Sequence, residues 1–104
     1  MRAGDLRHRI TLQTPATGED ELGQPLEGWT DLAPVWADVR NLGGLEAVRA
    51  NAEQGRVQSS IRIRWRPGLH TGLRVLHEGR PYNIKAVLPG PGRQHIDLVC
   101  EAGD

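Results

Sequence analysis

Apolar and polar residues alternate with a period of two along most of the chain, which is the pattern of β-strands with one buried face. The clearest example is the segment 57–66, where Ile61 and Ile63 alternate with Arg62 and Arg64. Most connections between such segments are short, which favours antiparallel pairing. The pattern therefore predicts about seven short, mostly antiparallel strands. The expected strands cover residues 8–14, 28–32, 35–40, 57–66, 73–77, 80–88 and 93–101.

One segment breaks the alternation and has the composition of a helix. Residues 45–54 contain good helix formers and no run of β-branched residues, and Gly55 can end the helix. A helix of about ten residues is marginal on its own in water, so it needs a neighbour, either the sheet or another subunit. Residues 1–104 are thus expected to form a single mainly β domain: a small antiparallel β-barrel or compact sandwich, crossed by one α-helix at about residues 44–55.

The same alternation predicts which side chains face the core. Because the sequence has no Phe, Trp65 and at least one other tryptophan are expected to anchor the core. Glu78 and Gly79 predict a tight hairpin turn. One shared face of a strand is expected to carry Tyr82, Ile84, Ala86 and Leu88.

Composition limits the class of protein. The chain has 104 residues with 13 Lys+Arg and 13 Asp+Glu, and a formal net charge of zero argues against a uniformly basic nucleic-acid-binding protein. No apolar segment follows the polar start and no apolar run reaches membrane-spanning length, so neither a signal peptide nor a membrane contact is expected. The single cysteine, Cys100, is expected to be a small buried residue in a strand.

Candidate catalytic and metal-binding chemistry is sparse. Ser59 and Ser60 fall inside a predicted strand without the glycines of a nucleophile elbow. The histidines lie in different elements without metal-ligand spacing. We therefore expect no enzyme activity, no metal site and no other cofactor. The four histidines are His8, His70, His77 and His95.

Charge is segregated along the sequence. Residues 14–39 hold six acidic residues and no basic residue, whereas residues 56–93 hold eight basic residues and one acidic residue. Several of the acids fall in a turn-rich loop that is predicted over about residues 15–27. The two segments are complementary in charge, so copies of the chain can pack head to tail. Such a contact closes into a ring or continues as a filament.

Three arginines of one predicted strand point to the same face. Arg62, Arg64 and Arg66 are two residues apart, and side chains at that spacing share one side of a strand. This stripe fits the phosphate backbone of a nucleic acid, the acidic residues of a neighbouring chain, or solvent. The pattern alone leaves these three alternatives open.

Five motifs, in this order and spacing, resemble those of bacteriophage head–tail joining proteins, the head-closure or stopper family. The resemblance runs from residue 1 to about residue 100. It lies in MRAGDLRHRITLQ (1–13), DELGQP (20–25), WTDLAPVWADVR (29–40), IRIRWRPG (61–68) and GRPYNI (79–84).

The resemblance implies a small β-barrel with one helix and no catalytic residues. It implies a ring, typically of twelve copies, that forms after DNA packaging below the portal and adaptor proteins, retains DNA and docks the tail. Segments 15–25 and 43–56 are expected to rearrange on assembly, and non-specific contact with packaged DNA is allowed. The location implied is the head–tail interface of a virion assembled in the bacterial cytoplasm, from a phage, a prophage or a gene transfer agent.

Two other functions compete with this one. The arginine stripe fits a small OB- or SH3-like nucleic-acid-binding module, and a tail-completion protein of the same virion would share the general barrel. For the connector role, the residues expected at subunit contacts or at the lumen of the ring are Glu19, Asp20, Glu21, Glu46, Arg49, Arg62, Arg64 and Arg66.

Overall fold

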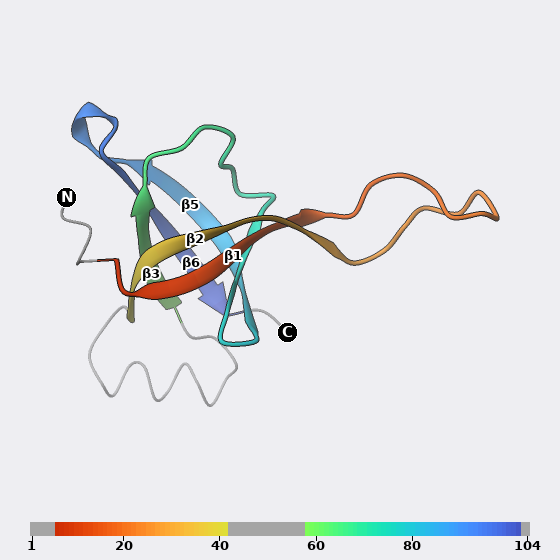
Figure 1. Cartoon of the computed structure of the whole chain (residues 1–104), viewed down its shortest axis with the longest axis horizontal. Coiled ribbons are helices and arrows are strands. Elements are labelled where there is room, and N and C mark those ends of the chain that lie inside the picture. Colours follow the sequence, from red (N-terminus) through yellow and green to blue (C-terminus); the bar gives the residue numbers. More distant parts are fainter. Residues whose placement is uncertain (1–5, 42–57, 103–104) are drawn as a thin grey trace.

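The computed structural model describes residues 6–41 and 58–102, and these residues form a closed barrel of six antiparallel strands (Figure 1). The strands are β1 (His8–Pro15), β2 (Trp29–Asn41), β3 (Gln58–Arg64), β4 (Arg74–His77), β5 (Arg80–Pro89) and β6 (His95–Ala102). Their order around the barrel is β1-β2-β3-β6-β5-β4, and the pairing of β4 with β1 closes the sheet. The mainly β fold predicted from the alternation is confirmed.

The helix expected at about residues 44–55 lies outside the described residues. Between β5 and β6 the structure has a short 3₁₀ turn, η2 (Pro91–Arg93). No helix in the described part of the chain combines the length and the apolar character needed to cross a membrane.

The predicted strands 28–32 and 35–40 form one strand, β2, so the break expected near Pro34 is absent. Pro34 pairs with Thr11 of β1, and β3 joins β2 only from Ala37 onwards. Within the described residues, β2 therefore has a neighbour on one side at Pro34. A proline is tolerated there because its missing N–H interrupts no ladder of hydrogen bonds on an open side.

The barrel interior is filled by the apolar residues that alternate along the strands. Burying such side chains is the main stabilisation of a small domain, at roughly 1.5–3 kcal/mol for each large one. The buried core consists of Ile10, Leu12, Ala37, Ile61, Ile63, Leu73, Val75, Tyr82, Ile84, Ile96, Leu98, Cys100 and Ala102.

A β-bulge in β5 reverses the inside–outside alternation near the end of that strand. The pairing with β6 shifts between Ile84 and Ala86, which makes Lys85 the extra residue. Val87 then packs against the core, and Leu88 is 53% exposed. The predicted shared face is therefore wrong in its second half.

Two of the three tryptophans lie outside the core. Trp65 packs against the core as expected, but Trp29 is 37% exposed and Trp36 is 53% exposed. The expectation of a second tryptophan in the core is wrong, and Tyr82 is the aromatic residue buried there. The outer indoles remain available for contacts on the surface.

The tight turn predicted between β4 and β5 is present. Glu78 and Gly79 both have positive φ, at 53° and 78°. Two successive positive φ angles characterise the type I′ turn, whose twist matches that of the flanking strands. The turn fixes the register of the hairpin that closes the barrel against β1.

Candidate functional site: a hairpin arm and an arginine groove

A long hairpin arm, residues 16–28, leads from β1 to β2 and projects away from the barrel (Figure 1). Its two sides are joined by backbone hydrogen bonds. The Ala16 N–H donates to the Gly28 carbonyl at 3.0 Å, and the Leu26 N–H donates to the Gly18 carbonyl at 3.1 Å. The segment predicted as a loop is thus a continuation of the β1–β2 hairpin.

The arm tip, residues 19–25, is a closed turn built around Asp20. The Asp20 carboxylate accepts hydrogen bonds from the N–H groups of Leu22 and Gln24, both at 2.9 Å. The Asp20 N–H donates to the Gln24 carbonyl at 2.8 Å, and the Gly23 N–H donates to the Asp20 carbonyl at 3.0 Å. A side chain that satisfies nearby backbone groups in this way is the usual means of fixing a turn. The tip therefore has a defined shape although it is exposed throughout.

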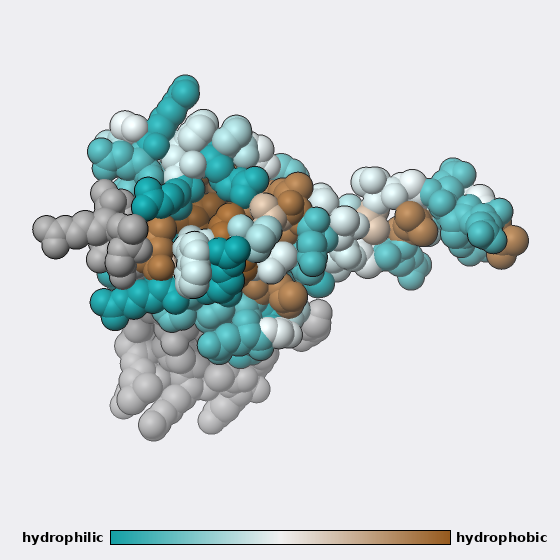
Figure 2. Space-filling model, viewed as in Figure 1, coloured by the Kyte–Doolittle hydropathy of each residue, from teal (hydrophilic) through white to brown (hydrophobic). Residues whose placement is uncertain are grey.

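The arm tip combines acidic charge with an exposed apolar side chain. Glu19, Asp20 and Glu21 stand next to Leu22, which is 84% exposed. In the described part of the chain, no Lys or Arg side chain forms an ion pair with these three carboxylates. Figure 2 shows hydrophobic atoms among hydrophilic ones at the far end of the arm. An ordered projection with this composition is suited to contact with another surface.

A polar network holds the root of the arm against the barrel. The buried Gln13 side chain donates from Nε2 to Asp31 Oδ1 at 2.7 Å, and its Oε1 accepts from Arg74 Nε at 2.7 Å. The guanidinium of Arg74 lies over the Trp29 ring, 4.4 Å from the ring centroid. β1, β2 and β4 each supply part of this network, so the direction of the arm is tied to three strands.

A hollow opens where β2 and β3 separate. Their pairing ends at Ala37 and Ile63, after which β3 continues beside β6. Val35 and Ile63 are among the residues that line the gap, and its volume is about 270 Å³. We refer to this hollow as the arginine groove, and its charged and aromatic lining residues are Arg9, Trp36, Arg64, Trp65 and Arg66.

The arginine groove is strongly basic. Among its lining residues are three arginines and no acidic residue. Arg9 lies over the Trp36 ring, with 5.0 Å between the guanidinium carbon and the ring centroid. Arg66 Nε is buried and has no hydrogen-bond acceptor among the described residues. The groove thus presents apolar indole surface beside cationic groups, one of which has an unused N–H.

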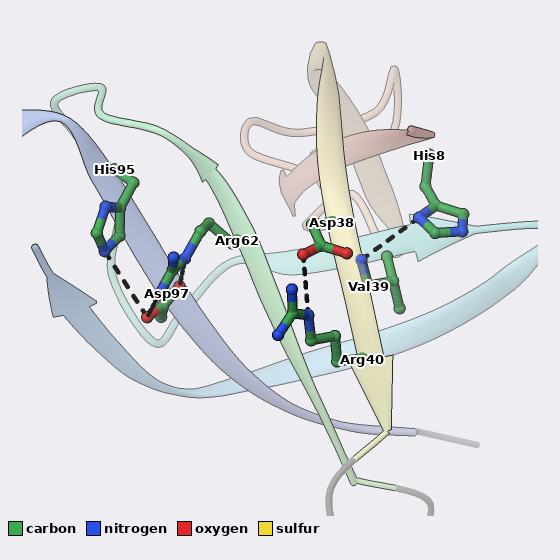
Figure 3. A network of polar contacts seen from close by, with 7 residues as sticks. All are labelled: His8, Asp38, Val39, Arg40, Arg62, His95 and Asp97. Atoms are coloured by element: carbon green, nitrogen blue, oxygen red, sulfur yellow. Dashed lines mark hydrogen bonds and ion pairs between the residues drawn. The ribbon is translucent and has the colours of Figure 1, made fainter. Parts of the chain in front are cut away.

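Charges on the outer face of β2, β3 and β6 balance one another within the molecule (Figure 3). Arg62 Nε and Nη2 donate to the two carboxylate oxygens of Asp97 at 2.7 and 3.0 Å. Arg40 Nε pairs with Asp38 at 2.9 Å. The hydrogen bond from Arg62 lowers the pKa of Asp97 from its ordinary value, although partial burial opposes the shift. Arg62 is therefore already neutralised by a partner in its own chain.

The structure divides the candidate residues of the sequence into separate groups. The three acids of the arm tip lie together, and Arg64 and Arg66 line the arginine groove, while Arg62 is turned to Asp97. Glu46 and Arg49 lie outside the described residues. Reasoning from sequence missed Arg9, Trp36 and Leu22. For Leu22, the available signal in the sequence is a leucine within an otherwise acidic turn. No local pattern indicates that Arg9 lies near β3.

The described residues offer little for metal binding or for nucleophilic catalysis by cysteine. Over residues 6–41 and 58–102, no three His, Cys, Asp or Glu side chains are placed to hold one metal ion. Cys100 is fully buried, as predicted, and burial raises the pKa of its thiol to about 12. A thiol with that pKa stays protonated and is a poor nucleophile near neutral pH.

Comparison with known proteins gives a consistent result over the whole chain. The family model described as phage head completion protein matches residues 1–103. The head completion protein gp7 of Enterobacteria phage HK97 is 33% identical over 109 residues, covering 99% of this chain and 97% of that protein.

Two solved structures share the fold. The solution structure of protein SF1141 from Shigella flexneri 2a superposes with a TM-score of 0.75 at 33% identity, covering 99% of this chain and 97% of that one. A chain in the virion of a native gene transfer agent particle has a TM-score of 0.66 at 17% identity, covering 92% of this chain and 93% of that one. At that lower identity the likeness concerns the fold alone.

Proposed function

The chain belongs to the phage head completion protein family, and from this premise we propose that it forms a ring at the head–tail interface of a tailed phage or prophage particle. In this role it is a structural subunit that sits below the portal and adaptor proteins, retains packaged DNA and presents a docking surface to the tail. It carries out no catalytic step. A ring of twelve copies, which the resemblance implies, is part of the proposal.

The match to head completion proteins along almost the entire chain is the observation that carries this proposal. The distribution of charge supports it. The acidic arm tip and the basic groove, which β1, β2 and the end of β3 form together, occupy different parts of the molecule, and a surface pair of this kind joins copies head to tail. Contacts of opposite charge also steer the encounter between subunits and select the register in which they meet.

Deletion of the gene from its phage or prophage tests the proposal. We expect heads that package DNA, lose it, and carry no tails, together with free tails. Supplying the wild-type chain from a plasmid should restore tailed particles, and electron cryomicroscopy of those particles should place a ring of this chain between head and tail. Tailed, infectious particles made without the chain would contradict the proposal.

Gene order separates the proposed role from that of a tail-completion protein. A head-closure subunit is expected to be encoded between the portal or capsid genes and the tail genes. A position of the chain on the tail side of the ring in the particle would favour tail completion instead. The nucleic-acid-binding alternative has less support, because Arg62 of the stripe is paired with Asp97.

A further inference from the structure

We infer that the arm tip of one copy, residues 19–25, binds in the arginine groove of the next copy. Leu22 is seated against Trp36, and the acidic residues of the tip face Arg64 and Arg66 of the neighbour. This inference rests on the proposed ring and names the contact between its subunits. Each subunit then gives one arm and receives another.

The two surfaces are complementary in chemistry. The groove offers indole walls to an apolar side chain and guanidinium groups to carboxylates. The tip offers Leu22, which is 84% exposed, with Glu21 directly before it in the chain. Arginine and carboxylate form paired, charge-assisted hydrogen bonds, and these are stronger than neutral ones. Packaged DNA would use the charges of the groove but would leave its apolar walls without a matching group.

One of the residues that line the groove carries an unsatisfied donor. Arg66 Nε is buried and lacks an acceptor among the described residues. A buried donor without an acceptor is unfavourable, and an acceptor supplied by a water, an ion or a bound partner removes that cost. A carboxylate at the end of an incoming arm supplies the acceptor that is missing in the isolated chain.

The geometry prevents an arm from reaching the groove of its own chain. Arg9 and Trp36 pair at one end of the β1–β2 hairpin, whereas Pro15 and Trp29 pair where the arm begins. From Trp36 to Pro25, where the tip begins, the hairpin runs 11 residues, which at ~3.3 Å per residue is about 36 Å. The donor and the acceptor surfaces therefore lie toward opposite ends of the β1–β2 hairpin, which makes the contact heterologous and able to close a ring.

Both surfaces are formed before they meet. The turn around Asp20 fixes the tip, and the network of Gln13 with Arg74 fixes the direction of the arm. At the groove, the Arg9 guanidinium already lies over the Trp36 ring. Association of preformed surfaces loses less conformational entropy than association of flexible ones.

Disulfide trapping in the particle tests the contact. The variant carries Leu22→Cys at the tip and Pro34→Cys at the groove, since Pro34 is exposed and lines the groove. Phage produced with this chain should give, under oxidation, a ladder of covalent multimers on non-reducing gels. Native Cys100 does not interfere because it is fully buried.

The matched control pairs Leu22→Cys with Asn83→Cys, an exposed position on β5. This control and Leu22→Cys alone should give no ladder. Tailed particles in which the tip and groove cysteines form no ladder would overturn the inference while leaving the ring intact. Cross-links from residue 22 to a portal or tail protein would also overturn it. Absence of the chain from the particle would instead refute the proposed function.

Charge exchange provides an independent test. Glu21→Arg or Arg64→Glu alone should reduce the yield of tailed particles by about tenfold or more, because like charges then face each other. The two changes together should restore most of the yield. Glu27→Arg on the arm and Lys85→Glu on β5 are the matched controls, and they should leave the yield unchanged. If the double variant shows no rescue and the heads leak DNA, the groove binds DNA and the inference is wrong.

Discussion

Arg74 of β4 lies over the ring of Trp29 of β2, with its guanidinium carbon 4.4 Å from the centroid of the ring. The contact joins the strand that closes the barrel to the strand that leads out of the arm. The same guanidinium donates to Gln13, so one side chain braces the arm through an aromatic face and a hydrogen bond. The arm is thereby an extension of the barrel with a fixed direction.

Replacing Arg74 by alanine should loosen the root of the arm. The variant loses the cation–π contact and leaves Gln13 Oε1 without its donor, at a cost of about 1–2 kcal/mol of stability. Hydrogen exchange should accelerate over residues 13–31 more than in β6, and tryptophan fluorescence should shift to the red. Lys85→Ala, the loss of an exposed cation on β5, is the control. Equal exchange rates in the two variants would contradict the bracing role.

Leu98 and Leu22 are leucines in opposite environments, so the same substitution should affect them differently. Leu98 is 0% exposed in the core and Leu22 is 84% exposed at the arm tip. Leu98→Ala should lower the free energy of unfolding by about 2–5 kcal/mol because it leaves a cavity. Leu22→Ala should change it by less than about 0.5 kcal/mol, but it should reduce the number of tailed particles. Urea denaturation and particle counts measure the two effects.

The ion pair of Arg62 with Asp97 should make stability depend on pH in the acid range. The folded-state pKa of Asp97 is lowered, so the stabilisation is complete above the unfolded value of about 3.9 and disappears as pH falls through the folded value. Asp97→Asn should therefore cost about 0.2–1 kcal/mol at pH 7, a small amount because the pair is partly exposed. Urea denaturation should show the two proteins converging at low pH. A constant difference down to pH 2 would contradict this origin.

The proposed ring should weaken as the salt concentration rises. Charges at the surface are screened over about 8 Å at 0.15 M ionic strength and over about 3 Å at 1 M. Native mass spectrometry of the chain with its portal and adaptor complex should show fewer bound copies after exposure to high salt. Strictly monomeric chain at low salt and high concentration, in the presence of that complex, would count against the proposal.

Local patterning was sufficient to predict the barrel but not its irregularities. Alternation in β1, β3 and β6 correctly placed residues such as Ile10, Ile61 and Leu98 inside. The bulge at Lys85 was not predictable, because an extra residue is recognised only when the partner strand is known. The same limit applies to Pro34, which the pattern suggests as a break between two strands. Whether a strand accepts a proline depends on which of its sides is paired, and β3 does not pair with β2 at Pro34.

The candidate site depended on contacts between residues far apart in the sequence. The clustering of the acids at the arm tip follows from the sequence alone, because Glu19, Asp20 and Glu21 are consecutive. By contrast, Arg62 was expected to act together with Arg64, and its pairing with Asp97 joins residues 35 positions apart. The arginine groove exists only because two strands separate, which no spacing of residues along one strand reveals.

Pro34 on the open side of β2 has a consequence for how copies of the chain meet. An uninterrupted strand edge would let subunits add to one another through backbone hydrogen bonds, as in fibrils, regardless of their side chains. A proline in that edge interrupts such growth. Any contact between copies along this edge is then left to side chains, so it depends on which residues meet and not on backbone pairing alone.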